Sequence, residues 1–526
     1  MPPRSPAVSP RSFIDEYRSG TLGDAFEFAA GDLTGSLDRP SLSQRDALVQ
    51  ALRADHVRWG AGPATMANIE RLAQPASRVV VTGQQVAWLL GPSYTFSKTV
   101  TALNLAASLD ADDRPVVPVF WMATQDHDVA EMDHAWVVGR DERVHRIGAP
   151  FPEGPAVGRA KLDPSWIDET VRALRAIDGD GPHADDVERL LRDAATDVPR
   201  WSDAFARLLL ALLGHRGLVV IDPLSHDVAR LWRALIDREL ERPELTPALV
   251  NGAGERLQAL GWAPQLTRAE GATNLFAEAP GGGPRTLVRF DATDGFDLGG
   301  ERIDRATLDE WLDDDPTALT PAAGLRPVLQ DALLPTAVFV VGPGELRYIA
   351  QLRGVYEAHG VAMPLVWPRA SATVLQPPVR RILARHGLDW QRVMHDPDGA
   401  ECSLQLQRHG HADAFAHSLA VVEREVGSLI AHVDAIDPTL AGTVHRGRHH
   451  LERTVLTLRE KAARALARRD IDTRRQFERL RVHLRPNGGL QERVVSPFSF
   501  FLTLGVESVR DAFLELPVEG DHAIEF

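Results

Sequence analysis

The sequence "VVVTGQQVAWLLGPSYTFSK", residues 79–98, has the pattern of a buried strand that runs into a turn and then a helix. The apolar run breaks at Gly83 and again at Gly91, and the stretch ends on Lys98. Residues 98–109 continue with helical apolar spacing, and residues 114–123, "RPVVPVFWMA", form a second apolar strand. This order predicts parallel strands joined by a right-handed crossover. We therefore expect a doubly wound α/β sheet, with its site at the carboxyl ends of the strands.

The rest of the chain predicts additions to this core. Residues 217–222 and 336–341 are further apolar strands, and the second runs into a Gly-Pro-Gly turn and a helix. Residues 1–75 are mainly helical in pattern, and the α/β core spans 76–385. Pro- and Gly-rich stretches indicate insertions at about 140–210 and 245–325. We expect residues 481–526 to return to the core.

Composition limits the classes of function. The 526 residues have a formal net charge of −15, which argues against a nucleic-acid partner because phosphate contacts need clustered Lys and Arg. No apolar run approaches the roughly 18 residues that span a bilayer, and the N-terminal residues lack the apolar segment of a signal peptide. We expect a cytoplasmic protein without membrane contact. The single cysteine, Cys402, excludes an intramolecular disulfide and any Cys-rich zinc site.

A heptad pattern dominates residues 386–480, where we expect a helical coiled-coil domain. From Phe415, apolar residues recur at alternating steps of four and three, at Leu419, Val422, Val426, Leu429, Val433, Ile436 and Leu440. Pro438 is expected to start a second helix, on which the pattern resumes at Val444, Leu451, Val455, Leu458 and Ala462. The pattern predicts an antiparallel helical hairpin over residues 415–480. The arginines of its second arm could indicate RNA, but such a face is more typically solvated or paired with acids.

Two loops contain the residues that could do chemistry. Neither GxxxxGK[ST] nor GxGxxG occurs in the chain, yet "GPSYTFSK" offers main-chain N–H groups, the hydroxyls of Ser93 and Thr95, and the Lys98 cation to an anion. The plainer interpretation is a tight turn with a solvated lysine. The second loop, "QDHDVAEMDH", residues 125–134, follows a strand with acids and histidines. It could bind a metal, transfer protons, or only place acids at a helix N-terminus.

Five stretches, in the order in which they occur, resemble the bacillithiol-biosynthesis cysteine-adding enzymes. They are residues 79–98, 118–134, 325–352, "MPLVWPRAS" at 363–371, and "LRPNGGLQERVVSPFSFFLTLG" at 484–505. The resemblance implies a Rossmann-like core with connecting insertions and a coiled-coil domain that forms a homodimer. It also implies ligation of L-cysteine to glucosaminyl malate, the last step of bacillithiol biosynthesis.

The resemblance also assigns site residues. The family's first block falls on Thr82, Gly83, Gln84, Gln85, Gly91, Pro92, Tyr94, Thr95 and Lys98, and its acid–histidine block on Asp126, His127 and Asp128, followed by His134. The later matches are Arg326, Gln330, Asp331, Gly342, Pro343, Glu345, Tyr348, Gln351 and Arg369. Gln125 is a departure, because relatives more often have an acid there, and this puts in doubt any role that needs a carboxylate at 125.

The chemistry of this ligation suits these residues. Formation of an amide from a carboxyl and an amine is thermodynamically unfavourable in water. The carboxyl must therefore be activated, most simply by ATP, and the amine must be deprotonated. Lys98 and main-chain N–H groups would stabilise the developing charge, and Asp126 or His127 would take the amine's proton or hold the ammonium of cysteine. Arg326, Arg347 and Arg369 are candidates for binding the malate carboxylates.

Two other functions remain open from the sequence. The Asp126, His127 and Asp128 cluster could serve a metal-dependent hydrolase, although no metal is predicted here. The coiled coil could belong to a nucleotide-binding scaffold without catalysis.

Overall fold

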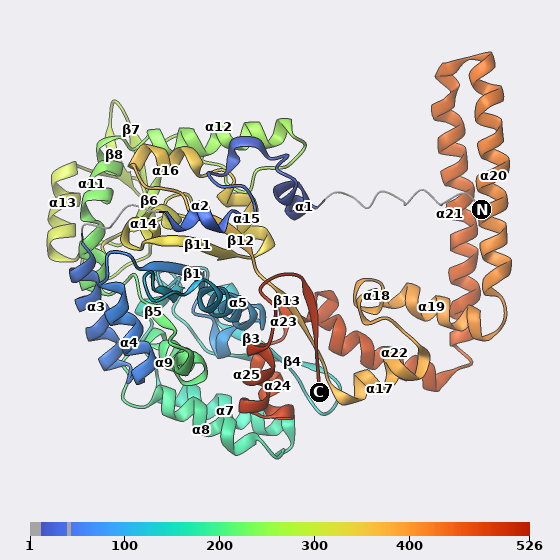
Figure 1. The fold of residues 1–526 in the computed structure, drawn as a ribbon, viewed down its shortest axis with the longest axis horizontal. Coiled ribbons are helices and arrows are strands. Elements are labelled where there is room, and N and C mark those ends of the chain that lie inside the picture. The colour runs from blue at the N-terminus through green and yellow to red at the C-terminus, as the bar shows by residue number, and fades with distance from the viewer. Residues whose placement is uncertain (1–11, 39–43) are drawn as a thin grey trace. The chain divides into compact units, whose positions relative to one another are not determined.

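The computed structural model describes residues 12–38 and 44–526, which Figure 1 shows as a ribbon. The chain divides into two compact units. The first contains the residues up to Val137, then 145–372 and 495–522, and the second contains 138–144, 373–494 and 523–526. Among the helices of the described residues, none is both long and apolar enough to cross a membrane.

The first unit is built on a five-stranded parallel sheet in the order β12-β11-β1-β2-β5. This confirms the doubly wound α/β prediction. The strands are β1 (Arg78–Gln84), β2 (Val116–Met122), β5 (Val219–Ile221), β11 (Thr336–Val341) and β12 (Leu365–Pro368). Four of these strands lie within a few residues of their predicted positions, and β12 was not predicted as a strand.

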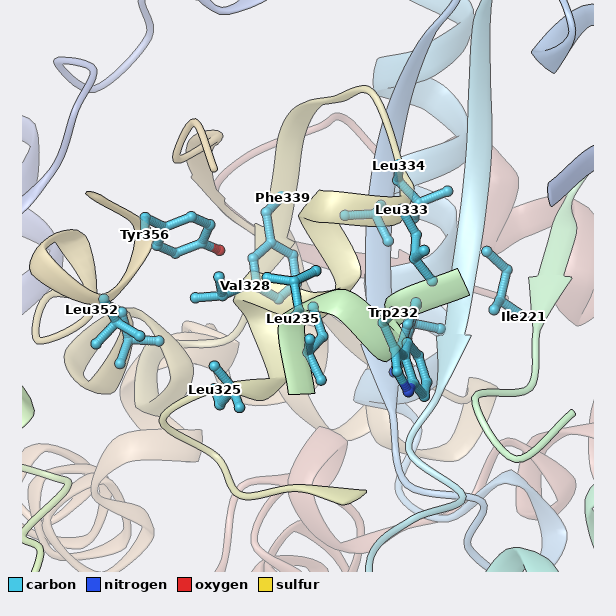
Figure 2. Close-up of a cluster of buried hydrophobic side chains, with 14 of the residues drawn as sticks. Ile221, Trp232, Leu235, Leu325, Val328, Leu333, Leu334, Phe339, Leu352 and Tyr356 are labelled. Carbon is cyan, nitrogen blue, oxygen red and sulfur yellow. The ribbon is translucent and has the colours of Figure 1, made fainter. Parts of the chain in front are cut away.

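Both faces of this sheet are buried, which explains why its strands are apolar at nearly every position. Val79, Val81 and Phe339 point into one hydrophobic cluster, and Val80 and Val338 into another on the opposite face. In the first cluster, Phe339 lies among side chains of flanking helices, including Trp232, Leu235 and Val328 (Figure 2). The sheet is thus a fully enclosed support for the loops at its ends.

Helices surround the sheet and connect its strands. Before β1 come α1 (Phe13–Arg18), α2 (Leu33–Leu37), α3 (Arg45–Arg58) and α4 (Pro63–Leu72). The helix α5 (Tyr94–Leu109) crosses from β1 to β2, while α14 (Arg326–Leu333), α15 (Pro343–Ile349) and α16 (Arg353–His359) flank β11. After the second unit, α24 (Pro497–Leu504) and α25 (Val506–Leu514) return to the first, where Phe96 of α5 contacts Phe501 and Phe513.

Two inserted regions lie between the strands of the main sheet. One includes α6 (Val129–Met132), β3 (His134–Val138), β4 (Val144–Gly148), α7 (Pro164–Asp178), α8 (Ala184–Ala195) and α9 (Trp201–Leu213). After β5 come α10 (His226–Ala229), α11 (Arg233–Glu241), α12 (Leu245–Ala259) and α13 (Arg305–Asp314). This second region has its own antiparallel sheet, ordered β10 (Leu319–Pro321), β6 (Ala272–Ala277), β7 (Thr286–Asp291), β8 (Gly295–Leu298) and β9 (Glu301–Ile303). This second sheet supplies side chains to the site.

The second unit is helical. It contains α17 (Pro377–His386), α18 (Trp390–His395), α19 (Pro397–Arg408), α20 (Ala412–Ile436), α21 (Ala441–Ala467), α22 (Ile471–Leu484) and α23 (Gln491–Val494). The short strands β13 (Ser371–Leu375) and β14 (Asp521–Glu525) pair with each other. The helices α20 and α21 form the predicted hairpin, but the second arm ends at Ala467, before the expected residue 480. Asp470 starts a new helix there, because its side chain accepts from the Thr473 main-chain N–H at 3.1 Å.

The heptad pattern of the hairpin is only partly buried within one chain. On α20 the half-buried apolar positions include Leu419, Val422, Val426, Ile430 and Val433. The heptad pattern predicted a covered residue at 429, but the half-buried residue is Ile430. An α-helix of 3.6 residues per turn drifts in this way against a strict 3.5-residue repeat. Among the described residues of the hairpin, the four most exposed large apolar side chains are Leu429, Ile436, Leu451 and Leu458, which are 51%, 80%, 45% and 56% exposed. We call these four residues the exposed stripe.

We predict that Gly83→Ala destabilises the first unit, because a Cβ at Gly83 would lie 2.7 Å from the main-chain oxygen of Trp121 on the neighbouring strand. Main chain cannot move aside cheaply, so we expect a loss of about 1–3 kcal/mol in the free energy of unfolding. Gly344→Ala is the matched control, since a Cβ there meets nothing within 4 Å. Urea unfolding measures both, and equal midpoints for Gly83→Ala and the wild type would contradict the prediction.

Candidate functional site

The predicted site residues gather at the carboxyl edge of the main sheet. Strands β1 and β11 lie side by side at its centre, and the chain connects them to neighbours on opposite sides. This is the switch point at which doubly wound sheets bind ligands. Gln84 ends β1 and Gly342 follows β11, so the loop after β1 and the Gly-Pro-Gly turn after β11 meet there.

Lys98 joins these two loops. Its side chain is only 1% exposed, and its Nζ donates to the main-chain oxygen of Gly83 at 2.6 Å and contacts Gln84 Oε1 at 3.3 Å. It also forms an ion pair with Glu345 of α15. The same Glu345 carboxylate accepts the Gly342 main-chain N–H at 2.8 Å, so it caps α15 and neutralises Lys98 together.

Burial lowers the pKa of Lys98, and the adjacent Glu345 carboxylate opposes this effect. The nearby guanidinium groups of Arg326 and Arg369 lower the pKa further. Lys98 is therefore not the solvated lysine of the plainer interpretation. It is a buried cation whose charge is balanced by the protein's own carboxylate.

Aromatic and arginine side chains surround this ion pair. Gln84 Nε2 donates to the Tyr94 hydroxyl at 3.0 Å, and the Arg369 guanidinium lies 5.5 Å from the centre of the Tyr94 ring. Arg326 donates to the Tyr348 hydroxyl at 3.3 Å. Burial raises the pKa of the Tyr348 phenol, with the Arg326 charge opposing, so the phenol stays protonated at neutral pH. Two arginines and two phenols thus line the edge beside Lys98.

The turn between β1 and α5 has a demanding conformation. Leu89, Leu90 and Gly91 have φ values of 50°, 63° and 62°, in the left-handed region that leucine rarely adopts. Ser496 holds this turn through a hydrogen bond from its hydroxyl to the Leu89 main-chain oxygen at 2.8 Å. Trp88 packs against Trp201 with ring centres 4.2 Å apart. Distant segments therefore impose the shape of this loop.

The main-chain N–H groups at the start of α5 already have acceptors. Ser93 N donates to Val495 O at 2.8 Å, Thr95 N to Pro92 O at 3.0 Å, and Phe96 N to Ser93 O at 3.0 Å. The side chains of Ser93 and Thr95 are also buried. An anion at this edge would accordingly meet side-chain cations more readily than these amides.

The acid–histidine loop lies at the end of β2, beside Gln85. Gln85 Nε2 donates to Asp126 at 2.7 Å and to Glu131 at 2.8 Å. The other Asp126 oxygen accepts the main-chain N–H groups of His127 at 2.7 Å and Asp128 at 3.3 Å. These donors orient the Asp126 carboxylate, which remains partly exposed.

His127 contacts a buried arginine that the sequence did not single out. Arg285 donates to His127 Nδ1 at 3.0 Å, to Thr320 Oγ1 at 2.9 Å and to the Pro321 main-chain oxygen at 2.8 Å. Its guanidinium also lies 3.9 Å from the centre of the Phe276 ring. Burial lowers the pKa of Arg285 to about 10, with the Asp126 and Glu278 carboxylates opposing, so the group is charged at neutral pH.

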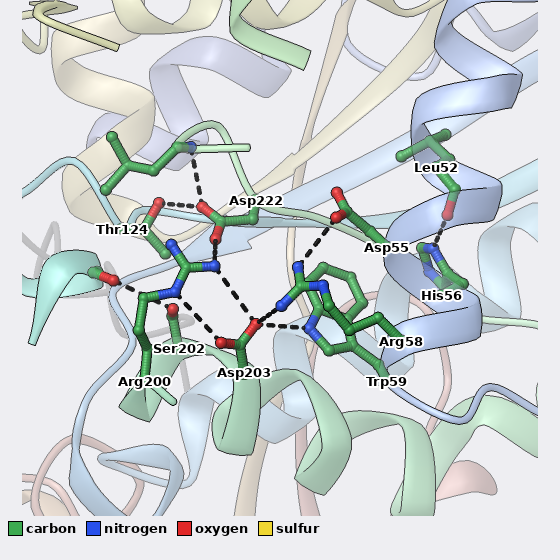
Figure 3. A network of polar contacts seen from close by, with 12 residues as sticks. Leu52, Asp55, His56, Arg58, Trp59, Thr124, Arg200, Ser202, Asp203 and Asp222 are labelled. Carbon is green, nitrogen blue, oxygen red and sulfur yellow. Dashed lines mark hydrogen bonds and ion pairs between the residues drawn. The ribbon is translucent and has the colours of Figure 1, made fainter. Parts of the chain in front are cut away.

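A second buried network fixes the start of this loop (Figure 3). Thr124 donates to Asp222 at 2.6 Å, and Arg200 lies between Asp222 and Asp203. Burial raises the pKa of the Asp222 carboxyl, with Arg200 opposing. Burial also acts to raise the pKa of Asp203, but Arg200, Trp59 and Arg58 outweigh it and hold that pKa below its usual value.

Several residues matched to the family's motifs bond within the fold instead of facing the edge. Thr82 donates to the Val340 main-chain oxygen at 2.9 Å, and Gln330 donates to Asp331 at 3.1 Å. Gln351 bonds to main-chain groups through both ends of its amide. These residues hold the loops that carry the site.

The remaining predicted ligands do not converge on a metal. His134 bonds to Asp133 at 2.7 Å, Asp128 is exposed, and His127 Nδ1 faces a guanidinium. Among the described residues no group of three or more His, Cys, Asp or Glu side chains could hold a metal ion. The Arg285 contact argues against a metal at Nδ1 of His127, because a cation already lies at that nitrogen.

Sequence reasoning missed Arg285, Phe276 and Asp222. Arg285 follows the glycine run "GGGP", and Phe276 lies in an ordinary apolar strand, so neither carries a local signal. Asp222 did offer one, because a carboxylate that directly ends a buried strand is expected to have a bonded partner.

The fold and the site define a Rossmann-like α/β protein with a helical hairpin domain and a charged site at the sheet's switch point. Residues 24–370 match the family description "Bacillithiol biosynthesis BshC, N-terminal Rossmann-like domain", and residues 372–524 match the description of its C-terminal coiled-coil domain. The chain belongs to the bacillithiol biosynthesis BshC family.

Similar curated proteins cover nearly the whole chain. Two of them, from different strains of Thermus thermophilus, are 40% and 39% identical over 87% and 91% of this chain, and over 89% and 93% of their own lengths. A third, from Salinibacter ruber, is 35% identical over 88% of this chain and 85% of its own. Each is named "Putative cysteine ligase BshC".

We predict strong coupling between Lys98 and Glu345. Lys98→Met or Glu345→Gln alone leaves one buried charge without its partner and should cost about 3–5 kcal/mol in the free energy of unfolding. The double variant should lose much less than the sum, because neither charge remains. Glu345→Gln keeps an oxygen for the Gly342 N–H, so it tests charge alone. Additive losses in chemical unfolding would show that the pair does not act as a unit.

Proposed function

We propose that this chain is a cytoplasmic, ATP-dependent ligase that joins the carboxyl of L-cysteine to the amine of glucosaminyl malate, in the last step of bacillithiol biosynthesis. The family membership and the printed name of the relatives support a cysteine ligase. One structural observation supports the ligation chemistry. Lys98, Arg326 and Arg369 lie near one another beside the end of β1, and the oriented Asp126 carboxylate follows the neighbouring strand β2.

Asp126 is the proposed proton acceptor. Three N–H donors fix the position of its carboxylate, and its side chain is about one-third exposed, so a substrate amine can reach it. An amine must lose its proton before it attacks a carboxyl carbon, and a carboxylate within hydrogen-bond reach can take that proton.

The cationic side chains beside Lys98 suit the carboxylates of malate. Lys98, Arg326 and Arg369 lie near one another at the edge, and Arg326 and Arg369 present planar forks that match phosphate or carboxylate oxygens. ATP, when bound, would supply the activation that makes amide formation favourable. Arg347, the third candidate for malate, bonds to the Ala263 main chain and lies 6.0 Å from the Trp262 ring centre, so we assign malate to Arg326 and Arg369.

The ligase proposal predicts an amide product when purified protein receives L-cysteine, glucosaminyl malate and ATP. Mass spectrometry detects the product, and omission of ATP should abolish it. Thiol profiling of cells with and without the gene provides the cellular measurement. No product in the assay, together with unchanged low-molecular-weight thiols in the cells, would reject the proposal.

The same assay tests the acid–histidine loop. Asp126→Asn and His127→Ala should each lower turnover by about a hundredfold or more, the scale of a lost proton-transfer group, with unchanged thermal unfolding. Glu153→Gln is the control, because it neutralises an exposed acid elsewhere in the first unit. Wild-type turnover in both loop variants would leave these residues without a catalytic role.

We also propose that the chain forms a homodimer through its hairpin. The exposed stripe is the supporting observation, because four large apolar side chains exposed on one helical hairpin gain stability when covered. A second copy offers the same stripe, and a two-fold axis would bring the two together.

Leu429→Glu combined with Leu458→Glu should convert the dimer into monomers, since carboxylates in an apolar contact cost several kcal/mol. Val433 is unsuitable for this test because it is half-buried between the arms of the hairpin. His432→Glu, which places the charge on an exposed position of the same helix, is the control. Sedimentation velocity at micromolar concentration gives the result, and a monomeric wild type would contradict the proposal.

A further inference from the structure

Arg285 reaches the site from the second, antiparallel sheet, and both its nitrogens and the face of its guanidinium have contacts within the protein. Its Nε and one terminal nitrogen bond to Thr320 and Pro321 of β10, while its flat face packs on Phe276 of β6. Only the other terminal nitrogen points at the acid–histidine loop, where it meets His127 Nδ1 at 3.0 Å. Because the first two bonds fix the plane of the guanidinium, the third is directed at the imidazole.

The chemistry of arginine determines which partner donates. A guanidinium has N–H donors and no acceptor, so Nδ1 of His127 must accept with its lone pair. The proton of the neutral ring then lies on Nε2. The alternative partner for Nδ1, an Asp126 oxygen, is 4.0 Å away, which is beyond hydrogen-bond distance.

We propose that Arg285 is a positioning residue that fixes His127 in the Nε2–H tautomer, so that His127 donates a hydrogen bond to a carboxyl or carbonyl oxygen of the substrate. This inference rests on the proposed ligation for the identity of the substrate. The sequence left open whether Asp126 or His127 takes the proton of the amine, and this inference gives the two residues different roles. Asp126 takes the proton of the amine, and His127 binds and polarises the oxygen of the carboxyl under attack.

The surroundings of His127 support this division. Its side chain is 39% exposed, so the ring reaches solvent while Nδ1 faces the protein, and its ring centre lies 5.5 Å from that of Phe276. A second proton on the ring would have to sit on Nδ1, directly opposite the Arg285 N–H. A donor aimed at a developing oxyanion stabilises the transition state more than the ground state.

Nitrogen-15 NMR of the full-length protein, labelled at histidine, reads the tautomer without substrate. His127→Gln identifies the His127 signals by their loss. In the wild type, Nε2 should show the shift of a protonated ring nitrogen and Nδ1 that of an unprotonated one. Arg285→Met should mix the two tautomers, and Arg285→Lys, which keeps a donor, should retain the wild-type pattern. A wild-type ring protonated on Nδ1 would overturn the inference, even if Arg285→Met fails to fold.

Kinetics supply the second measurement. Arg285→Met should lower kcat about tenfold or more, because loss of the group that fixes a catalytic histidine's tautomer costs up to about 10⁴-fold in other enzymes. The KM for ATP should stay unchanged, and Arg285→Lys should recover most of kcat. Arg289→Met is the matched control, since Arg289 also bonds to a main-chain oxygen of the second sheet region, that of Glu270 at 2.6 Å. A kcat for Arg285→Met equal to that of the control would overturn the inference.

The two measurements separate this inference from the proposed function. An Nε2–H tautomer that depends on Arg285, in a protein that makes no amide, would reject the ligase and leave the positioning role standing. Amide formation with an Nδ1–H ring would reject the positioning role alone.

Discussion

The buried ion pair between Lys98 and Glu345 is the interaction on which the site depends. A lysine that is 1% exposed would be very costly without a partner, so its position is fixed by where Glu345 and the Gly83 oxygen lie. Those partners come from α15 and β1, on the two sides of the switch point. The pair therefore ties together the two loops that any ligand at this edge must contact. Removal of either charge would loosen both loops together.

The rest of the first unit can be understood as support for that edge. The left-handed conformations of Leu89 and Leu90 are unfavourable locally and persist because residues far away in the sequence hold them. Ser496 and Trp201 supply these contacts, and Asp222 does the same for the loop after β2. The inserted regions and the returning segment thus have a physical role even though they add no strand to the main sheet.

The sequence predicted what depends on local pattern and failed where long-range contacts decide. The parallel strands were predictable because a sheet buried on both faces needs continuous apolar runs, and the hairpin because a heptad repeat needs a covered face. The burial of Lys98 could not be predicted, since Glu345 lies 247 residues away. The contact of Arg285 with His127 could not be predicted either, because it depends on how the second sheet packs against the loop after β2. The half-buried position on α20 is Ile430 and not Leu429 because a helix has 3.6 residues per turn, and this difference could have been predicted from the sequence.

The proposed binding of an anionic substrate has to be reconciled with the acidity of the chain. With a net charge of −15, the protein as a whole does not attract malate or phosphate groups over long distances, so binding must depend on cations that the ligand meets directly. Lys98 is already neutralised by Glu345, and Arg285 faces inward. Arg326 differs from Lys98, because it bonds to a phenol and an amide. Arg369 contributes a second guanidinium beside Lys98. In the proposed ligase, Arg326 and Arg369 would recognise the anionic substrate through two planar forks, and selectivity would depend on their geometry more than on the number of positive charges.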